Sequence, residues 1–152
     1  VYVPEMLIAA RAMQAGLNLL EPVLAATGHK AKAKVAIGTV KGDLHDIGKN
    51  LVIMMLKGFG FEVEDLGVDC RLEQYQGAAE RGAQVICLSA LLSTTRDEMR
   101  PVAQYFSEIE GVKIVVGGAV ITQEFADAIG ADGYGVDATD AVRAVRQCLG
   151  LV

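Results

Sequence analysis

A short segment of the chain places an aspartate, a histidine and a second aspartate directly after an apolar run. The segment reads VAIGTVKGDLHDIGKNLV, residues 35–52, and its polar side chains include Asp43, His45 and Asp46. Residues two apart in an extended segment point the same way, so Asp43 and His45 can hydrogen-bond to each other or contact one ligand. Asp46 can cap the helix that follows, and Gly48 leaves the first turn of that helix without a side chain, so a ligand can approach the backbone closely.

Three kinds of ligand chemistry compete for these residues. A phosphate loop requires G-x-x-x-x-G-K-[ST], but five residues separate Gly42 from Gly48, and Asn50 follows Lys49 where a hydroxyl is needed. A hydrolytic or non-haem metal centre needs several histidines or carboxylates, and the only other histidine, His29, precedes the first strand. The remaining chemistry is a single histidine ligand, oriented by a neighbouring carboxylate, for a metal whose other ligands come with a cofactor.

A plain structural explanation competes with this metal site. Metal sites seldom rest on one protein ligand, so an isolated histidine beside an aspartate is more often a capped, hydrogen-bonded turn residue. The motif alone therefore favours the structural explanation, and the choice depends on the rest of the chain.

The elements that position these residues follow from the hydrophobic pattern, in which strand-length apolar runs alternate with helical patterns. Strands are predicted at residues 34–40, 61–66, 83–89, 112–118 and 131–136, and helices at 46–57, 71–81, 95–110, 121–129 and 138–149. This alternation predicts an α/β fold with a parallel sheet covered on both faces. Right-handed crossovers favour a doubly wound, flavodoxin-like (Rossmann-like) sheet of five strands in the order 2-1-3-4-5. Ligands of such folds bind beyond the carboxyl ends of the strands, where the Asp43 segment lies.

The first 27 residues stand outside this alternation. They predict a long helix with an apolar stripe and, beside it, a stripe of small residues. We expect the chain to divide into residues 1–30, this helix and a linker, and residues 31–152, the α/β domain. The first residue is Val1 and not Met, which suggests a missing beginning. The apolar stripe comprises Met6, Ala10, Met13, Leu17, Leu20 and Leu24, and the small-residue stripe comprises Ala9, Ala12 and Gly16.

Composition narrows the class of partner. Hydrophobic residues make up 52% of the chain and aromatic residues only 5%, which predicts an aliphatic core of ordinary size. A formal net charge of −5 gives no general attraction to nucleic acid or anionic lipid, and no apolar run is long enough to span a bilayer. The three cysteines lie far apart without a C-x-x-C pair, as expected for reduced thiols of a cytoplasmic protein. We expect its partners to be small molecules and proteins.

Three motifs in order resemble those of a known family. D-x-H-x-x-G, here residues 43–48, resembles the signature of cobalamin-binding domains that hold the corrinoid with its nucleotide base displaced from cobalt. The same family has Ser-x-Leu after the third strand, here residues 89–91, and a double glycine after the fourth strand, here residues 117–118. Their joint occurrence reverses the preference for a structural histidine. The resemblance runs from about residue 34 onward, and residues 7–24 look like the last helix of the four-helix cap of methionine synthase and of anaerobic corrinoid proteins.

The resemblance implies a role for each motif residue. The implied cofactor is cobalamin or a related cobamide, bound base-off with His45 as the lower axial cobalt ligand. Asp43 would accept a hydrogen bond from the other ring nitrogen, and Thr95 would supply the hydroxyl that completes the relay, where methionine synthase has serine. The implied cofactor contacts are His45, Asp46, Gly48, Ser89, Leu91, Ser93, Gly117 and Gly118.

Two main functions are consistent with such a domain. The first is a methyl carrier that accepts a methyl group on Co(I) from a donor-specific methyltransferase and passes it to a second methyltransferase with a folate or thiol acceptor. Such a protein is a component of a methyltransferase system and not a catalyst on its own, and a reductive activator is a further expected partner. The second is the cobalamin subunit of an adenosylcobalamin-dependent mutase, but mutases of this type lack the helical cap. A cobalamin-based sensor module is a third alternative, which a separate output domain would reveal.

Overall fold

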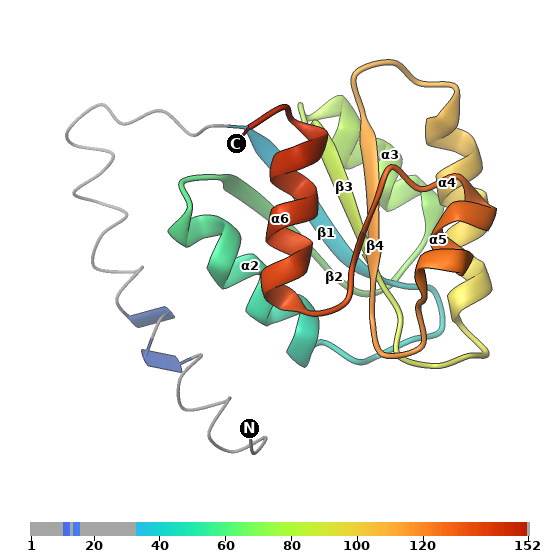
Figure 1. Cartoon of the computed structure of the whole chain (residues 1–152), viewed down its shortest axis with the longest axis horizontal. Coiled ribbons are helices and arrows are strands. Elements are labelled where there is room, and N and C mark those ends of the chain that lie inside the picture. The colour runs from blue at the N-terminus through green and yellow to red at the C-terminus, as the bar shows by residue number, and fades with distance from the viewer. Residues whose placement is uncertain (1–10, 13, 16–32, 152) are drawn as a thin grey trace.

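The protein forms a three-layer α/β domain with a five-stranded parallel sheet in its centre (Figure 1). The computed structural model describes residues 11, 12, 14, 15 and 33–151. The strand order is β2-β1-β3-β4-β5, and every described neighbouring pair is parallel, so the predicted doubly wound fold is confirmed. The strands are β1 (Lys34–Val40), β2 (Glu62–Cys70), β3 (Val85–Ser89), β4 (Lys113–Gly117) and β5 (Gly133–Gly135).

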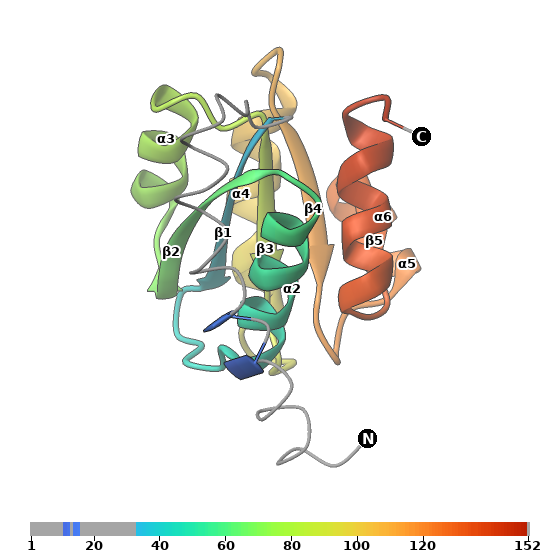
Figure 2. The ribbon, with the colours of Figure 1, turned by 90° about the vertical axis from the view of Figure 1, so that its left-hand side faces the viewer.

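Helices cover both faces of the sheet. One face is covered by α2 (Ile47–Gly58) and α6 (Ala138–Cys148), and the other by α3 (Leu72–Glu80), α4 (Met99–Ser107) and α5 (Gln123–Ile129). Figure 2 shows α3 and α6 on opposite sides of the sheet. None of the described helices is long and apolar enough to cross a membrane.

The central strand β3 shows how the two layers share the sheet. Ile86 and Leu88 pack with α3, α4 and α5, whereas Val85 and Cys87 pack with α2 and α6. Successive side chains of a strand point to opposite faces, so a strand covered on both faces must be apolar at every position. This is why the continuous run VICLS correctly predicted a buried strand.

The strand β2 is longer than its sequence suggests. Its apolar pattern predicted residues 61–66, but the strand runs to Cys70 and pairs with β1 through two irregular steps. At each step β2 has one residue more than β1, as in a β-bulge. The register passes from Ile37–Asp65 to Gly38–Gly67 and then to Val40–Cys70.

The helix predicted at residues 95–110 is divided into two elements. A short 3-10 helix, η1 (Arg96–Glu98), precedes α4, which begins at Met99. Pro101 explains this start, because proline lacks a backbone N–H and is tolerated only in the first turn of an α-helix. Of the predicted N-terminal helix, residues 11, 12, 14 and 15 are helical, and the rest of its two stripes lies outside the described residues.

Candidate functional site

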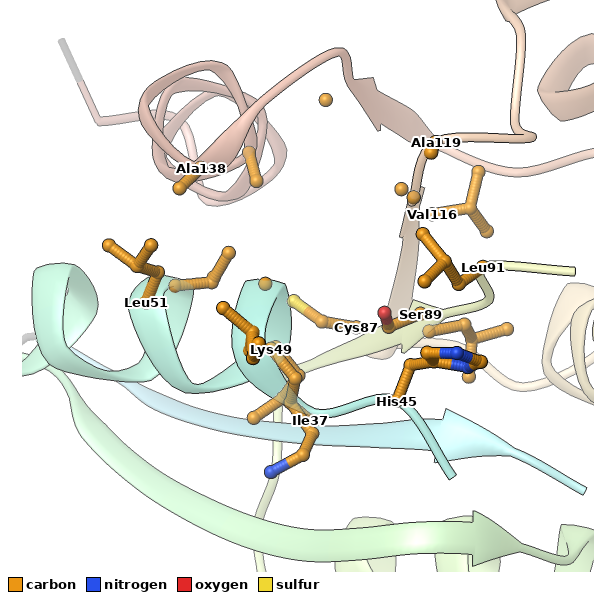
Figure 3. A pocket seen from close by; sticks show the side chains of 18 of the residues that line it. Ile37, His45, Lys49, Leu51, Cys87, Ser89, Leu91, Val116, Ala119 and Ala138 are labelled. Atoms are coloured by element: carbon orange, nitrogen blue, oxygen red, sulfur yellow. The ribbon is translucent and has the colours of Figure 1, made fainter. Parts of the chain in front are cut away.

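An apolar cavity of about 570 Å³ opens between α2 and α6 at the carboxyl edge of the sheet (Figure 3). Ile37, Cys87 and Val115 line it from the three central strands, and Ala138 lines it from α6. His45 lies at this cavity on the segment that leads into α2. A cavity of this size, lined mainly by apolar groups with a few polar ones, is typical of a small-molecule or cofactor site.

A tight turn after β1 places Asp43 beside His45. The N–H of Asp43 donates to the carbonyl of Val40 at 3.1 Å, which closes a four-residue turn after β1. Gly42 has a φ of +83°, the left-handed value that the third position of a type II turn requires. The glycine in this motif therefore serves the turn, and the turn delivers Asp43 to a fully buried position.

His45 is held by three hydrogen bonds. Its ring Nδ1 lies 2.7 Å from Oδ1 of Asp43, and its backbone N–H donates to the same oxygen at 3.0 Å. The hydroxyl of Thr39 donates to the carbonyl of His45 at 2.7 Å. The His45 side chain is 49% exposed while that of Asp43 is 0% exposed, so a buried carboxylate orients a ring that faces outward.

The second oxygen of Asp43 ties this segment to the end of β3. Oδ2 accepts hydrogen bonds from the N–H of Leu91 at 2.8 Å and from the Thr95 hydroxyl at 2.8 Å. Burial by itself would raise the pKa of Asp43, but the N–H groups of Leu91 and His45 and the Thr95 hydroxyl favour the charged form. Together they hold the pKa of Asp43 well below its usual range, so Asp43 is a carboxylate at neutral pH.

The charge of Asp43 determines which nitrogen of His45 can bind a metal. An ionised carboxylate only accepts hydrogen bonds, so Nδ1 must carry the proton of the 2.7 Å contact. In a neutral imidazole the other nitrogen, Nε2, then has a free lone pair. Among the described residues no hydrogen-bond partner is seen for Nε2. His45 is therefore oriented to present Nε2 to a ligand.

The described residues do not supply a cage for a bare metal ion. No group of three or more histidine, cysteine, aspartate or glutamate side chains within the described part of the chain could hold one. A metal at Nε2 of His45 would therefore need most of its ligands from another source. This donor set, beside a large apolar cavity, matches a metal that is already held by an organic macrocycle.

The predicted glycines around the cavity are not all required by the packing of the chain. A Cβ on Gly118 would lie 1.9 Å from the carbonyl oxygen of Ala90, and a Cβ on Gly117 would lie 3.1 Å from that of Gly135. These two glycines are needed for the close packing of the chain itself. A Cβ on Gly48 would meet nothing within 4 Å, although Gly48 lines the cavity. Of these three glycines, only Gly48 leaves open space where a side chain would begin.

The structure brings most of the predicted contact residues to the cavity, but not all of them. Asp46, Ser89 and Leu91 line it together with His45 and the three glycines. Ser93 is exposed on the segment after β3 and is absent from the lining, and Thr95 is buried behind Asp43. Thr95 therefore contacts Asp43, the residue that orients His45. The predicted contact between Ser93 and the cofactor stays a prediction.

The predicted capping role of Asp46 is wrong. Asp46 occupies the N-cap position of α2, but its side chain makes no capping hydrogen bond. Its φ of −131° and ψ of −4° differ from the extended backbone that lets a capping side chain reach back to the first turn.

Sequence reasoning missed several residues at this site. Thr39 is fully buried and holds the carbonyl of His45, and its only sequence signal is a polar residue near the end of an apolar strand. Leu44 and Val136 line the cavity but are 72% and 67% exposed, so they form an apolar rim at its mouth. Such exposed aliphatic residues carry no motif, and their grouping is visible only once the strands are placed side by side.

Comparison with known proteins identifies similar sequences over nearly the whole chain. A model of the B12 binding domain family matches residues 33–143. A corrinoid protein of Desulfitobacterium hafniense (strain Y51) is 40% identical over 156 aligned residues, which cover 98% of this chain and 72% of that protein. Dimethylamine corrinoid protein 2 of Methanosarcina acetivorans is 42% identical over 153 residues, which cover 97% of this chain and 71% of that protein.

Solved structures show the same architecture. A cobalamin-binding protein from Desulfitobacterium hafniense DCB-2 superimposes with a TM-score of 0.78 at 28% identity, covering 97% of this chain and 71% of that one. The methanol:cobalamin methyltransferase complex of Methanosarcina barkeri contains a chain that superimposes with a TM-score of 0.80 at 29% identity. The match covers 100% of this chain and 60% of that one.

Proposed function

This chain belongs to the B12 binding domain family, and from this membership we propose that it is a corrinoid protein that carries a methyl group between two methyltransferases. In this proposal a donor methyltransferase delivers the methyl group and an acceptor methyltransferase removes it. The protein holds the corrinoid base-off, with His45 on the lower face of cobalt.

The observation that carries the proposal is the hydrogen-bonded series from Thr95 through Asp43 to His45. The Thr95 hydroxyl lies 2.8 Å from one oxygen of Asp43, and Nδ1 of His45 lies 2.7 Å from the other. Metal-binding histidines commonly donate their second ring N–H to a carboxylate, which fixes the tautomer and raises the basicity of the ligating nitrogen. The series therefore has the arrangement that a metal-binding histidine uses, with Nε2 of His45 turned away from the carboxylate.

The cavity suits the bulky parts of a corrinoid. Its apolar walls between α2 and α6 can hold the displaced nucleotide base, and the missing side chain at Gly48 leaves additional space along the lining. The rim residues Leu44 and Val136, together with the exposed Leu91, offer aliphatic surface to a flat ring placed above His45. Covering such exposed side chains stabilises the complex by about 25 cal/mol for each Å² of apolar surface removed from water.

When bound, the corrinoid supplies a cobalt atom that can accept and release a methyl group. The side chains of this chain then act on the cofactor from below. His45 offers a nitrogen ligand, Asp43 sets its orientation, and Thr95 holds the carboxylate in place. The apolar cavity excludes water from the nucleotide end of the cofactor.

The relatives favour methyl transfer over a mutase. Their names are those of dimethylamine and trimethylamine corrinoid proteins, and a similar solved chain belongs to a methanol:cobalamin methyltransferase complex. The alignments cover 97% of this chain or more, so they include most of residues 1–30, the segment predicted to be a cap helix. Methanol and methylated amines are therefore the methyl donors that we propose for the partner enzyme.

Methyl uptake tests the proposal directly. The chain is loaded with cobalamin, reduced and mixed with methanol- or methylamine-specific methyltransferases and their substrates, while the cobalt absorbance is followed. We expect one donor class to methylate the loaded chain. A His45→Ala chain loaded to the same extent should be methylated at a different rate. A mutase assignment would replace ours if no methyl donor reacted while the adenosylcobalamin-loaded chain activated a mutase partner.

A further inference from the structure

The end of β2 is bent toward the segment that carries His45. The two irregular pairing steps with β1 fall between Asp65 and Cys70, and Gly67 and Asp69 have φ values of +87° and +51°. Asp69 is the one residue other than glycine with a positive φ in the described part of the chain. Bulges beside binding sites often redirect a side chain, and aspartate tolerates the left-handed region better than most residues.

Asp69 holds the beginning of the His45 segment. The N–H of Gly42 donates to Oδ1 of Asp69 at 2.7 Å, and the N–H of Asp69 donates to the carbonyl of Asp43 at 3.0 Å. The side chain and the backbone of one residue therefore both contact the turn that delivers Asp43. If this contact is lost, the carboxylate that orients His45 loses part of its support.

Asp65 holds the end of the same segment. Its Oδ1 accepts a hydrogen bond from the ammonium of Lys49 at 2.8 Å and another from the N–H of Gly67 at 2.9 Å. Lys49 is only 2% exposed and lies in the first turn of α2, next to Gly48. A buried ammonium requires a charged or polar partner, so Lys49 ties the start of α2 to β2.

From these contacts we propose that Asp65 and Asp69 are positioning residues, which clamp the two ends of segment 42–49 and thereby set the placement of His45. The inference rests on the proposed function, in which His45 is the metal ligand that the clamp positions. Neither carboxylate touches the cavity among the described residues, so both act through Gly42 and Lys49. β2 is therefore not only an edge strand of the sheet. Its irregular end places two carboxylates in contact with segment 42–49.

Hydrogen exchange of the chain without corrinoid tests the clamp independently of the cofactor. Asp69→Gly removes the carboxylate and keeps a residue that adopts positive φ freely. We expect the amide protons of Gly42 and His45 to exchange about three- to tenfold faster, the effect of losing one hydrogen bond. Asp69→Asn keeps an acceptor oxygen and also tolerates this backbone, so it should restore the wild-type rates.

Asp132 offers a matched control at the opposite edge of the sheet. Its Oδ2 accepts from the N–H of Ile114 at 2.8 Å, and its own N–H donates to the carbonyl of Ile114 at 2.8 Å. This arrangement resembles that of Asp69 but is remote from His45. Asp132→Ala should therefore lower the stability of the domain without changing the exchange of the His45 amide.

The second arm of the clamp needs its own variants. Asp65→Ala should also speed exchange at His45, whereas Asp65→Asn should not, because the amide oxygen can still accept from Lys49. In Asp65→Ala the Lys49 ammonium keeps Oδ1 of Asn50 as an acceptor at 2.8 Å but loses its charged partner. If this variant does not fold, the double variant Asp65→Ala with Lys49→Met removes the buried charge together with its carboxylate partner. The double variant should fold and still show faster exchange at His45.

The absorbance of the cobalamin-loaded protein distinguishes a positioning role from a merely structural one. In cobalamin-loaded Asp69→Gly we expect a smaller fraction of the His45-dependent absorbance, with Asp132→Ala unchanged. The clamp is overturned if Asp69→Gly and Asp132→Ala lose stability alike while exchange and absorbance at His45 stay at wild-type values. If the wild-type absorbance does not depend on His45 at all, the proposed function fails. In that case faster exchange would still support the clamp, and unchanged exchange would overturn it.

Discussion

The backbone N–H of Leu91 donates a 2.8 Å hydrogen bond to Oδ2 of Asp43, a residue 48 positions earlier in the chain. The same carboxylate holds His45 through its other oxygen. The ends of β1 and β3 are therefore joined at the residue that orients His45. This relationship joins the two motifs in space, because a main-chain N–H of Ser-x-Leu donates to the carboxylate of D-x-H-x-x-G.

Asp43→Asn should weaken both the fold and the orientation of His45. Asp43 accepts hydrogen bonds on both oxygens, and an asparagine must turn its NH₂ group toward one of these sets of donors. We expect the free energy of unfolding to fall by about 1–3 kcal/mol, the range for a buried group left unsatisfied. Urea unfolding measures the loss, and Asp127→Asn, on an exposed part of α5, should change the stability little.

The same variant should show a characteristic pH dependence. Because the folded-state pKa of Asp43 is lowered, its contribution to stability is fully present above the unfolded pKa of about 3.9 and is lost as the pH falls toward the folded pKa. The difference in unfolding free energy between wild type and Asp43→Asn should therefore shrink as the pH falls below about 5. A difference that widens as the pH falls below about 4 would contradict the lowered pKa.

Two substitutions at Thr95 separate the effect of its hydroxyl from the effect of its side-chain volume. Thr95→Val keeps the volume and removes the donor to Asp43, so it should cost about 1 kcal/mol of stability and increase the mobility of the His45 ring. Thr95→Ser keeps the hydroxyl and should retain the ring order. Relaxation measurements on the His45 ring by NMR compare the two variants. If the His45 ring is equally mobile in the valine and serine variants, the Thr95 hydroxyl does not order it.

Gly48→Ala should change stability and cofactor affinity in opposite directions. Alanine in place of a helical glycine stabilises a helix by about 0.5–1 kcal/mol, and the chain leaves space for the added methyl group. The methyl group would also take up space in the cavity that Gly48 lines, so corrinoid should bind more weakly. Gly58→Ala, at the far end of α2 and also unhindered, is the matched control and should leave affinity unchanged. Unchanged affinity in Gly48→Ala would mean that the ligand does not pass this residue.

The parallel sheet and the contact between Asp43 and His45 were predictable because each follows from a pattern in the sequence. Alternating apolar runs and helices imply the parallel sheet, and the D-x-H spacing puts two side chains on one side of the chain. The third and fourth strands end side by side at the same edge, so the sequence alone predicted that Ser89 and Gly117 lie on the same side of the sheet as His45. These features are expressed within short stretches of sequence.

Other features depend on contacts that no local pattern shows. The end of β2 contains Gly67 and Asp69, which are typical of a turn, and it stays in the sheet because of hydrogen bonds to the Gly42 turn. Asp46 has the residue type of a helix cap but the wrong backbone angles for one. Thr39 has no motif, and its role follows only from the position of the His45 carbonyl.

The nitrogen that binds cobalt can be identified by electron paramagnetic resonance. The chain is produced with ¹⁵N-histidine, loaded with unlabelled cobalamin and reduced to the Co(II) state. We predict that each cobalt line is split in two by a ¹⁵N nucleus, that the splitting persists in His29→Gln, and that it is lost in His45→Gln. Lines split in three in the labelled wild type would show that the unlabelled nucleotide base remains on cobalt, which would contradict the assignment of His45 as the metal ligand.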